Sequence, residues 1–422
     1  MRVLFISERF PDDLPTNVFG AFKRMHMLLE AASQAGELDV LFLFSSEAAF
    51  SSEDLGAFRE ALARYWSIRP ELFFCRFDRD PAPRALATRL LFRARCLAHG
   101  AVTFSNEVLR SDGCFPPQMR ALDRCLDRAP DAIVAHRLGS MAPLLMSRRT
   151  LPPIFFDLDD VEHVKAYRFG WRAGDVRRRL RFLTSVPALL WSETRAIERS
   201  YQTFVSSEVD RRRFARLGLG DKLRVVPNAV TIPPVATLPV EPTLLFLGTY
   251  IYQPNIEAAE WLLSEIWPRI IRAVPSARLL IGGPHPERIP SYRTLSAGVE
   301  FLGFVEDLGE LYRRSRVVCC PIRSGAGTRI KIIEAAAFGR PVVATTIGNE
   351  GLDLRDGEEV LLRDGTRGFA EACVQLLTDT ELCERLAGAA RLAIRRRYDR
   401  ASVVATIRDT VNQALVWQRT VR

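Results

Sequence analysis

A glycine-rich segment in the C-terminal third carries the residue types best suited to binding an anion. It reads SGAGTRIKIIEAAAFG, residues 324–339, and lies between two short apolar runs, VVCCPI and PVVAT, that predict β-strands. Gly325 and Gly327 allow the backbone to approach a ligand closely. Thr328 is a candidate N-cap for the apolar helix that follows. The N-terminus of such a helix attracts anions, because its first N–H groups are unpaired and its dipole is positive there.

Three charged side chains refine this prediction. Arg329 and Lys331 fall in the first helical turn, where positive charge opposes the helix dipole unless an anion offsets it. Lys331 is one of only four lysines in a chain whose other basic residues are arginine. Glu334 follows three residues later on nearly the same helix face. The pattern predicts a phosphate near the lysine and hydroxyl groups of a ribose at Glu334; the alternative is a helix cap with a surface ion pair.

Composition narrows the class of protein. The chain has 422 residues, 48% of them hydrophobic, and a formal net charge of +9, which fits a globular protein of two or three domains. A basic balance suits nucleic acid, anionic membranes or anionic small substrates. The arginines are scattered and no nucleic-acid motif is visible, so we expect no nucleic-acid partner.

The cysteines and the N-terminus indicate a compartment. None of the eight cysteines forms a CxxC pair, and most lie in apolar segments, which predicts buried, reduced thiols. The start, MRVLFISERF, lacks the pattern of a secretion signal. No apolar run reaches the roughly 18 residues of a membrane span. We therefore expect a cytoplasmic protein.

The order of predicted elements indicates two α/β domains. Strand-like and helix-like runs alternate from RVLFI to PIFFDLDD, stop at the proline-rich segment TIPPVATLPVEP (231–242), and resume at TLLFLG. We predict Rossmann-like domains over 1–232 and 243–395, with a C-terminal helix, 396–422, packing back towards the first. Doubly wound sheets bind ligands beyond the carboxyl ends of their strands, so the expected site is the cleft between the domains.

The segment SGAGTRIKIIEAAAFGRPVVATTIGNEGL resembles the nucleotide-sugar motif of family 4 glycosyltransferases, which have the GT-B fold. The segments RVVPNAV, FLGTYIYQPNIEAAEWLLSEIWPRI, ARLLIGG and GVEFLGFVEDLGELYRRSRVVCCPIR keep the family order around it, and the resemblance covers about 200–410 well. It implies a retaining hexosyltransferase-like enzyme that transfers a sugar from a nucleotide-diphosphate sugar, without cofactor or metal. It also implies a saccharide or lipid-linked acceptor.

The resemblance assigns roles to particular residues. Glu334 resembles the ribose-binding glutamate, and His136 resembles the histidine on the acceptor side, where an imidazole orients a hydroxyl. His136, Lys331 and Glu334 are the expected catalytic residues. The residues expected around the donor are Gly20, Gly248, Gly325, Gly327, Thr328, Arg329, Lys331, Glu334 and Glu350.

Two departures from the family pattern keep other functions open. Ala326 stands where the family has a first glutamate, and Gly248 is not followed by the usual Arg-x4-Lys pair. The variant pattern resembles a subgroup tied to bacterial surface or exported polysaccharides. The alternatives are a nucleotide-sugar epimerase of the same fold, a binding protein without chemistry and, more distantly, a dinucleotide oxidoreductase.

Other polar segments have structural readings beside functional ones. The acids of DLDD (157–160) fit a strand-end turn or helix cap better than a catalytic role. His26 fits a solvated helix position, and His163 is a weaker candidate for the cleft. The segment 167–183 mixes arginines with aromatic residues; it is either a solvated surface helix or a contact with an anionic membrane.

Overall fold

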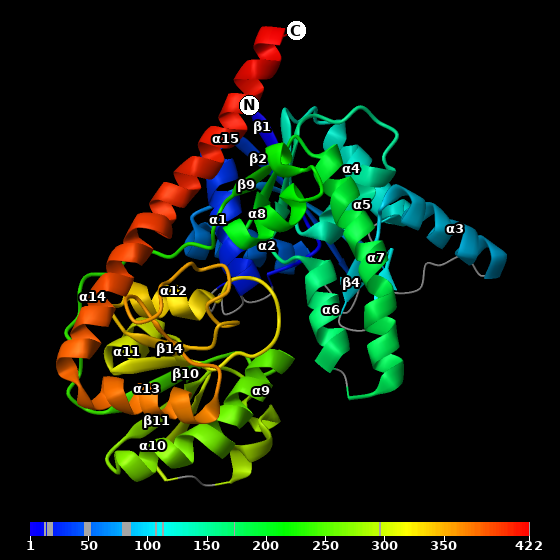
Figure 1. Cartoon of the computed structure of the whole chain (residues 1–422). Helices are drawn as coiled ribbons and strands as arrows, with labels where there is room; N and C mark the ends of the chain where they lie inside the picture. The colour runs from blue at the N-terminus through cyan, green and yellow to red at the C-terminus, as the bar shows by residue number, and fades with distance from the viewer. Residues whose placement is uncertain are drawn as a thin grey trace. The chain divides into compact units, whose positions relative to one another are not determined.

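The computed structural model describes residues 1–421 except 12–13, 15–19, 46–51, 78–85, 106–107, 112–113, 173 and 295–296. The chain divides into two compact units, Met1–Val226 with Val403–Arg422, and Pro227–Ser402 (Figure 1). Each unit is a parallel sheet flanked by helices. The predicted α/β class of two Rossmann-like domains is confirmed.

The first unit contains a seven-stranded sheet of order β3-β2-β1-β6-β7-β8-β9, parallel throughout. The strand order reverses between β1 and β6, so the carboxyl ends of these two strands form a topological switch point. The strands are β1 (Arg2–Ser7), β2 (Glu37–Ser45), β3 (Glu71–Phe77), β6 (Ala132–His136), β7 (Ile154–Leu158), β8 (Gln202–Val205) and β9 (Leu223–Val225), with a separate antiparallel pair β4 (Thr103–Ser105) and β5 (Val108–Arg110).

The unit also contains α-helices, several of which pack on the sheet through apolar residues at helical spacing. They are α1 (Gly20–Ala35), α2 (Ser52–Ala61) with a π-helical extension (Leu62–Trp66), α3 (Leu86–His99), α4 (Pro116–Leu126), α5 (Leu138–Met146), α6 (Glu162–Arg172), α7 (Val176–Arg199), α8 (Glu208–Ala215) and, from Val403, α15 (Arg400–Val421). In α15 the buried side chains of Val404, Ile407, Val411 and Ala414 share one face.

The second unit contains a six-stranded parallel sheet of order β12-β11-β10-β13-β14-β15, which reverses between β10 and β13. Its strands are β10 (Thr243–Leu247), β11 (Arg278–Gly282), β12 (Val299–Gly303), β13 (Val317–Cys320), β14 (Val342–Ala344) and β15 (Leu361–Leu362). Its α-helices are α9 (Gln253–Trp261), α10 (Trp267–Ala273), α11 (Leu308–Arg313), α12 (Ile330–Ala337), α13 (Thr366–Thr378) and α14 (Thr380–Arg397). One core cluster joins both faces of the sheet.

The proline-rich segment is bound along the second unit. Arg340 is fully buried and donates to the carbonyl oxygens of Ala236 and Thr237 at 3.0–3.2 Å. Arg316 donates to the Pro239 oxygen at 3.0 Å. Proline lacks an N–H group and cannot pair as a strand, so side-chain donors supply the hydrogen bonds instead. The sequence placed the end of the first domain at residue 232, and the contacts place it at Val226.

The cysteines agree with a further expectation. All eight cysteines are buried and free of disulfides, as predicted. In the part of the chain that the structure describes, no helix combines the length and the apolar character needed to cross a bilayer.

Replacing Arg340 with Ala tests the anchoring of the proline-rich segment. We expect the free energy of unfolding to fall by about 2–3 kcal/mol, because two carbonyl groups lose hydrogen bonds from a buried charged donor. Urea unfolding measures this. The control is Arg367→Ala, whose side chain is 83% exposed and should change stability by less than about 0.5 kcal/mol. Equal effects in the two variants would contradict the account.

Candidate functional site

The predicted donor residues of the second unit gather at the switch point of its sheet. Strand β10 ends at Leu247 and strand β13 at Cys320, and these two strands are neighbours. Residues 321–329 connect β13 to α12, and Lys331 lies in the first turn of that helix. The position agrees with the general rule for ligands of doubly wound sheets.

Lys331 forms the centre of this cluster. Its ammonium group donates to the Leu247 carbonyl oxygen and, at 3.0 Å, to Oδ1 of Asn255. It also lies 4.6 Å from the centre of the Phe246 ring. Within the described residues no carboxylate forms a salt bridge with it. Burial, with a smaller contribution from Arg329, lowers the pKa of Lys331 to about 8. The cation is held by neutral oxygens, which leaves its charge available to an anion.

Two glycines allow the strands and loops around Lys331 to meet. A Cβ atom at Gly248 would lie 2.9 Å from Cγ of Asn255, the residue that binds the lysine. Gly283 has φ of +126°, and a Cβ atom there would lie 1.8 Å from the Gly248 carbonyl oxygen. A side chain at either position would displace Asn255 or the end of β10. Gly248, predicted to contact the donor, therefore has a packing role as well.

The loop before α12 is shaped by glycine and by Arg329. Gly325 and Gly327 have φ of +96° and +75°, a region that favours glycine. Arg329 donates to the carbonyl oxygens of Ala326 and Gly327, and to that of Ser324 at 3.2 Å. The Arg329 guanidinium therefore closes its own loop, whereas the sequence interpretation used its charge for the ligand. The first turn of α12 contains no acidic residue.

The prediction that Thr328 caps α12 is wrong. The N-cap is Arg329, and no side chain makes the cap hydrogen bond. Thr328 Oγ1 instead accepts a hydrogen bond of 2.8 Å from Asn228, which is buried. Asn228 belongs to the segment RVVPNAV, so the motif was visible, but its contact with residue 328 required the fold.

Glu334 has a partner that the sequence did not reveal. Tyr312 of α11 donates its hydroxyl to Oε2 of Glu334 at 3.2 Å. Burial and the Glu334 charge raise the pKa of Tyr312 well above its usual value, so the phenol stays protonated and donates. The ring of Tyr312 stacks on Phe338 at 5.0 Å. The half-buried carboxylate of Glu334 is thereby held in one orientation.

Glu350 lies in the turn that follows β14. This turn is close to the end of β13, because a Cβ atom at Gly348 would lie 2.9 Å from the Cys320 carbonyl oxygen. Thr345 Oγ1 accepts from the Gly348 N–H at 2.8 Å and donates to the Ile322 oxygen. The turn carrying Glu350 is therefore fixed against the start of the segment that leads to α12.

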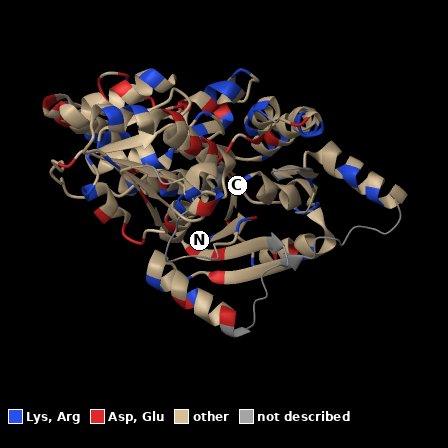
Figure 2. Cartoon of the chain, turned by 90° about the horizontal axis from the view of Figure 1, so that it is seen from below, with Lys and Arg blue, Asp and Glu red and all other residues tan. Residues whose placement is uncertain are grey.

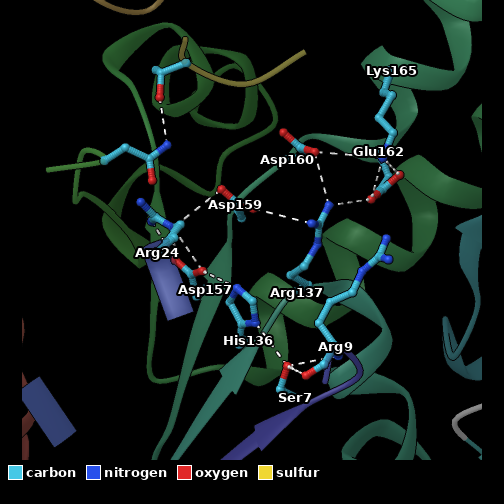
Figure 3. Close-up of polar contacts among 12 residues, drawn as sticks. Ser7, Arg9, Arg24, His136, Arg137, Asp157, Asp159, Asp160, Glu162 and Lys165 are labelled. Carbon is cyan, nitrogen blue, oxygen red and sulfur yellow. Dashed lines mark hydrogen bonds and ion pairs between the residues drawn. The ribbon is translucent and has the colours of Figure 1, made fainter. Parts of the chain in front are cut away.

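In the first unit, His136 ends β6 at the other switch point (Figure 3). Its ring is fully buried, with Nδ1 3.2 Å from the Ser7 hydroxyl at the end of β1. Nε2 lies 3.9 Å from Oδ2 of Asp157. Burial and then the charge of Arg137 lower the pKa of His136 well below 6.5, so the imidazole is neutral at physiological pH.

The acids of DLDD form ion pairs around His136, whereas the sequence interpretation gave them a strand-end turn or a helix cap. Asp157 accepts from Arg24 at 2.6 Å, and both side chains are fully buried. Arg137 lies 3.5 Å from Asp159 and 3.1 Å from Asp160. Arg137 has φ of 70° and ψ of 162°, a strained conformation for a residue with a side chain. The strain marks the turn between β6 and α5 as a functional candidate.

The remaining candidates have separate positions. Gly20 is exposed and begins α1; residues 15–19 before it lie outside the described residues. His163 bonds through Nδ1 to Glu193, a buried carboxylate. His26, which the sequence suggested was solvated, stacks on Trp66 at 4.8 Å instead.

Comparisons with known proteins agree with this geometry. Residues 241–379 match the family described as "Glycosyl transferases group 1". The chain is 31% identical over 211 residues to the phosphatidyl-myo-inositol mannosyltransferase of Mycobacterium leprae, covering 46% of this chain and 55% of that protein. The chain thus spans about half the length of the curated relatives it matches.

Solved structures resemble the whole chain. Sucrose-phosphate synthase from Thermosynechococcus elongatus superposes with a TM-score of 0.66 at 15% identity, covering 98% of this chain and 99% of that one. Anabaena HepE, solved with UDP and glucose, has a TM-score of 0.63 at 15% identity, with 98% and 100% covered. The fold is GT-B. The sequence match to the group 1 glycosyl transferases lies in residues 241–379, and the solved structures, at 15% identity, show the fold alone.

The lowered pKa of Lys331 makes a prediction about ligand affinity. A bound diphosphate would stabilise the ammonium form and raise its pKa, so affinity should fall as the pH rises above the free pKa of about 8. For the nucleoside diphosphate that stabilises the protein most, the dissociation constant should be about tenfold larger at pH 9 than at pH 7. Calorimetric titration measures it.

The control for this titration is Lys331→Met, which keeps the length of the side chain without its charge. This variant should bind weakly at both pH values and lose the difference. If wild type and Lys331→Met showed the same pH dependence of affinity, the assignment of Lys331 to the diphosphate would be contradicted.

Proposed function

We propose that the protein is a retaining glycosyltransferase that moves a hexose from a nucleotide-diphosphate sugar to an acceptor hydroxyl. The observation that carries the proposal is the ammonium group of Lys331. It is held by neutral oxygens at a sheet switch point, in the first turn of a helix without acidic residues there. A diphosphate is the anion that suits this position.

The leaving group is the nucleoside diphosphate, which gains negative charge as the bond to the sugar breaks. The Lys331 ammonium and the backbone N–H groups of residues 327–329 are proposed to stabilise that charge without a metal or another cofactor. Glu334, oriented by Tyr312, is proposed to accept hydrogen bonds from the ribose hydroxyls. Gly20, Gly325 and Glu350 remain proposed donor contacts.

His136 is proposed to act on the acceptor side. Its neutral imidazole can accept a hydrogen bond from an acceptor hydroxyl, with the Ser7 hydroxyl fixing the orientation of the ring. The buried ion pair between Arg24 and Asp157 holds the next strand in place. His136 thus requires no change of charge during the reaction near neutral pH.

The proposed role is bacterial polysaccharide or glycoconjugate synthesis, with a saccharide or lipid-linked acceptor. The similarity to a mannosyltransferase named for a phosphatidyl lipid supports a lipid-linked acceptor. Such an acceptor fits a protein that lies on the inner face of a membrane. The aromatic and basic segment 167–183 supports this, since it exposes Tyr167 and Trp171.

A second candidate is a nucleotide-sugar-binding protein without chemistry. Ala326 favours it, because the carboxylate that the family places there is missing. Such a protein would bind the donor and release no nucleotide from it.

Screening nucleotide sugars by thermal shift tests donor binding, because a ligand that binds only the folded state stabilises it. Wild type should be stabilised by at least one nucleotide sugar. Lys331→Ala should lose that shift, and Glu334→Gln, which weakens the hydrogen bonds to the ribose, should lower kcat/KM for the donor about 10- to 100-fold. Controls are Lys222→Ala, which removes a lysine bound to the Ser200 carbonyl oxygen in the other unit, and Glu371→Gln, whose side chain is 66% exposed.

The outcomes separate the candidates. Transfer to an added acceptor supports the transferase. Tight donor binding without any nucleotide release, with all acceptors tried, favours the binding protein. Undiminished donor affinity in Lys331→Ala would rule out the phosphate assignment.

A further inference from the structure

Helix α3 (Leu86–His99) exposes more apolar surface than a solvated helix requires. Leu86, Leu90 and Leu91 are 70%, 57% and 72% exposed, and Leu97 is also exposed. Only Cys96 is buried, although Phe92 is partly buried with it in a small cluster. Isolated exposed leucines are ordinary, whereas four on one short helix mark an interaction surface.

The exposed residues of α3 form a continuous face. At 3.6 residues per turn, the leucines and three alanines occupy an arc of about 140°. Phe92 and Cys96 lie on the opposite side, where Phe92 stacks on Phe115 at 5.1 Å. Trp191 of α7 donates to the Leu97 carbonyl oxygen at 2.9 Å. The helix is therefore fixed to its unit by one side and presents its apolar side outwards.

The charges that border the apolar face are all positive. Arg89 and Arg93 lie along one edge and Arg95 along the other, and α3 has no acidic residue. Figure 2 shows this helix with basic positions only. In the described part of the chain, none of the three arginines has a salt-bridge partner. An apolar face bordered by arginine is the pattern of a helix that lies in the interface of an anionic membrane.

We propose that α3 docks this unit onto an anionic lipid surface, with its leucines among the acyl chains and its arginines at the headgroups. A second copy of the chain is a poorer occupant of this face, because two α3 helices facing each other would bring their arginines together. The inference extends the membrane contact proposed above to a second element. It does not depend on transferase activity.

Co-sedimentation of the full chain with vesicles tests the proposal. We expect binding to vesicles of phosphatidylcholine with phosphatidylglycerol, little binding to phosphatidylcholine alone, and loss of binding at high salt. The double variant Leu90→Gln/Leu91→Gln should lower the partition coefficient at least about tenfold. Arg89→Gln/Arg93→Gln should lower it roughly 25-fold and remove the preference for anionic lipid.

Matched controls are Leu217→Gln, an exposed leucine outside α3, and Arg212→Gln, an exposed arginine of α8. Both should bind vesicles as wild type does. The thermal shift with a nucleotide sugar should be the same in all four variants, which separates docking from donor binding. The proposal is overturned if wild type does not bind anionic vesicles or if the α3 variants bind them as wild type does. It is also overturned if sedimentation velocity shows that Leu90→Gln/Leu91→Gln abolishes self-association of the chain.

Discussion

The hydrogen bond from the Lys331 ammonium to the last carbonyl of β10 is the interaction around which the second unit is arranged. It joins the central strand to the first turn of α12, and Asn255 adds the start of α9. Burying an ammonium without a carboxylate is costly, which explains its lowered pKa. The neighbouring features support this arrangement. Gly248 and Gly283 let the loops approach closely, and Arg329 closes the adjoining loop.

The topology of both sheets brings polar groups together in the same way. In each sheet the strand order reverses beside the first strand. The two strands that are neighbours at this point are not consecutive in the chain. In one unit this brings Ser7 to His136; in the other it brings Leu247 to the segment before α12. The chemistry differs, since His136 is neutral and fully buried whereas Lys331 is cationic at neutral pH.

Much of the fold could be predicted from the sequence because buried strands and amphipathic helices leave periodic patterns. The runs RVLFI, DAIVA, TLLFLG and ARLLIGG became β1, β6, β10 and β11 within one or two residues. Helix α3 was missed. Its apolar residues face outwards. A search for helices that turn an apolar face to the core therefore does not find it.

The candidate site could be predicted by residue type but not by contact. The glycines, Lys331 and Glu334 stand out by type and spacing. Tyr312 and Asn228 did not, because their partners are 22 and 100 residues away. Arg329 shows the converse: its charge indicated a ligand, and the folded loop uses it internally. Contacts of this kind depend on backbone geometry that local patterns do not encode.

Hydrogen exchange with and without a nucleoside diphosphate tests the central claim most directly. The claim is that a diphosphate binds at the switch point of the second unit. Wild type, with whichever of UDP, GDP, ADP or CDP stabilises it most, should show slowed exchange in 324–332 and 248–255. Peptides from α13 and α14 should be unchanged. Slowed exchange confined to other segments, with no change in 324–332, would contradict the account.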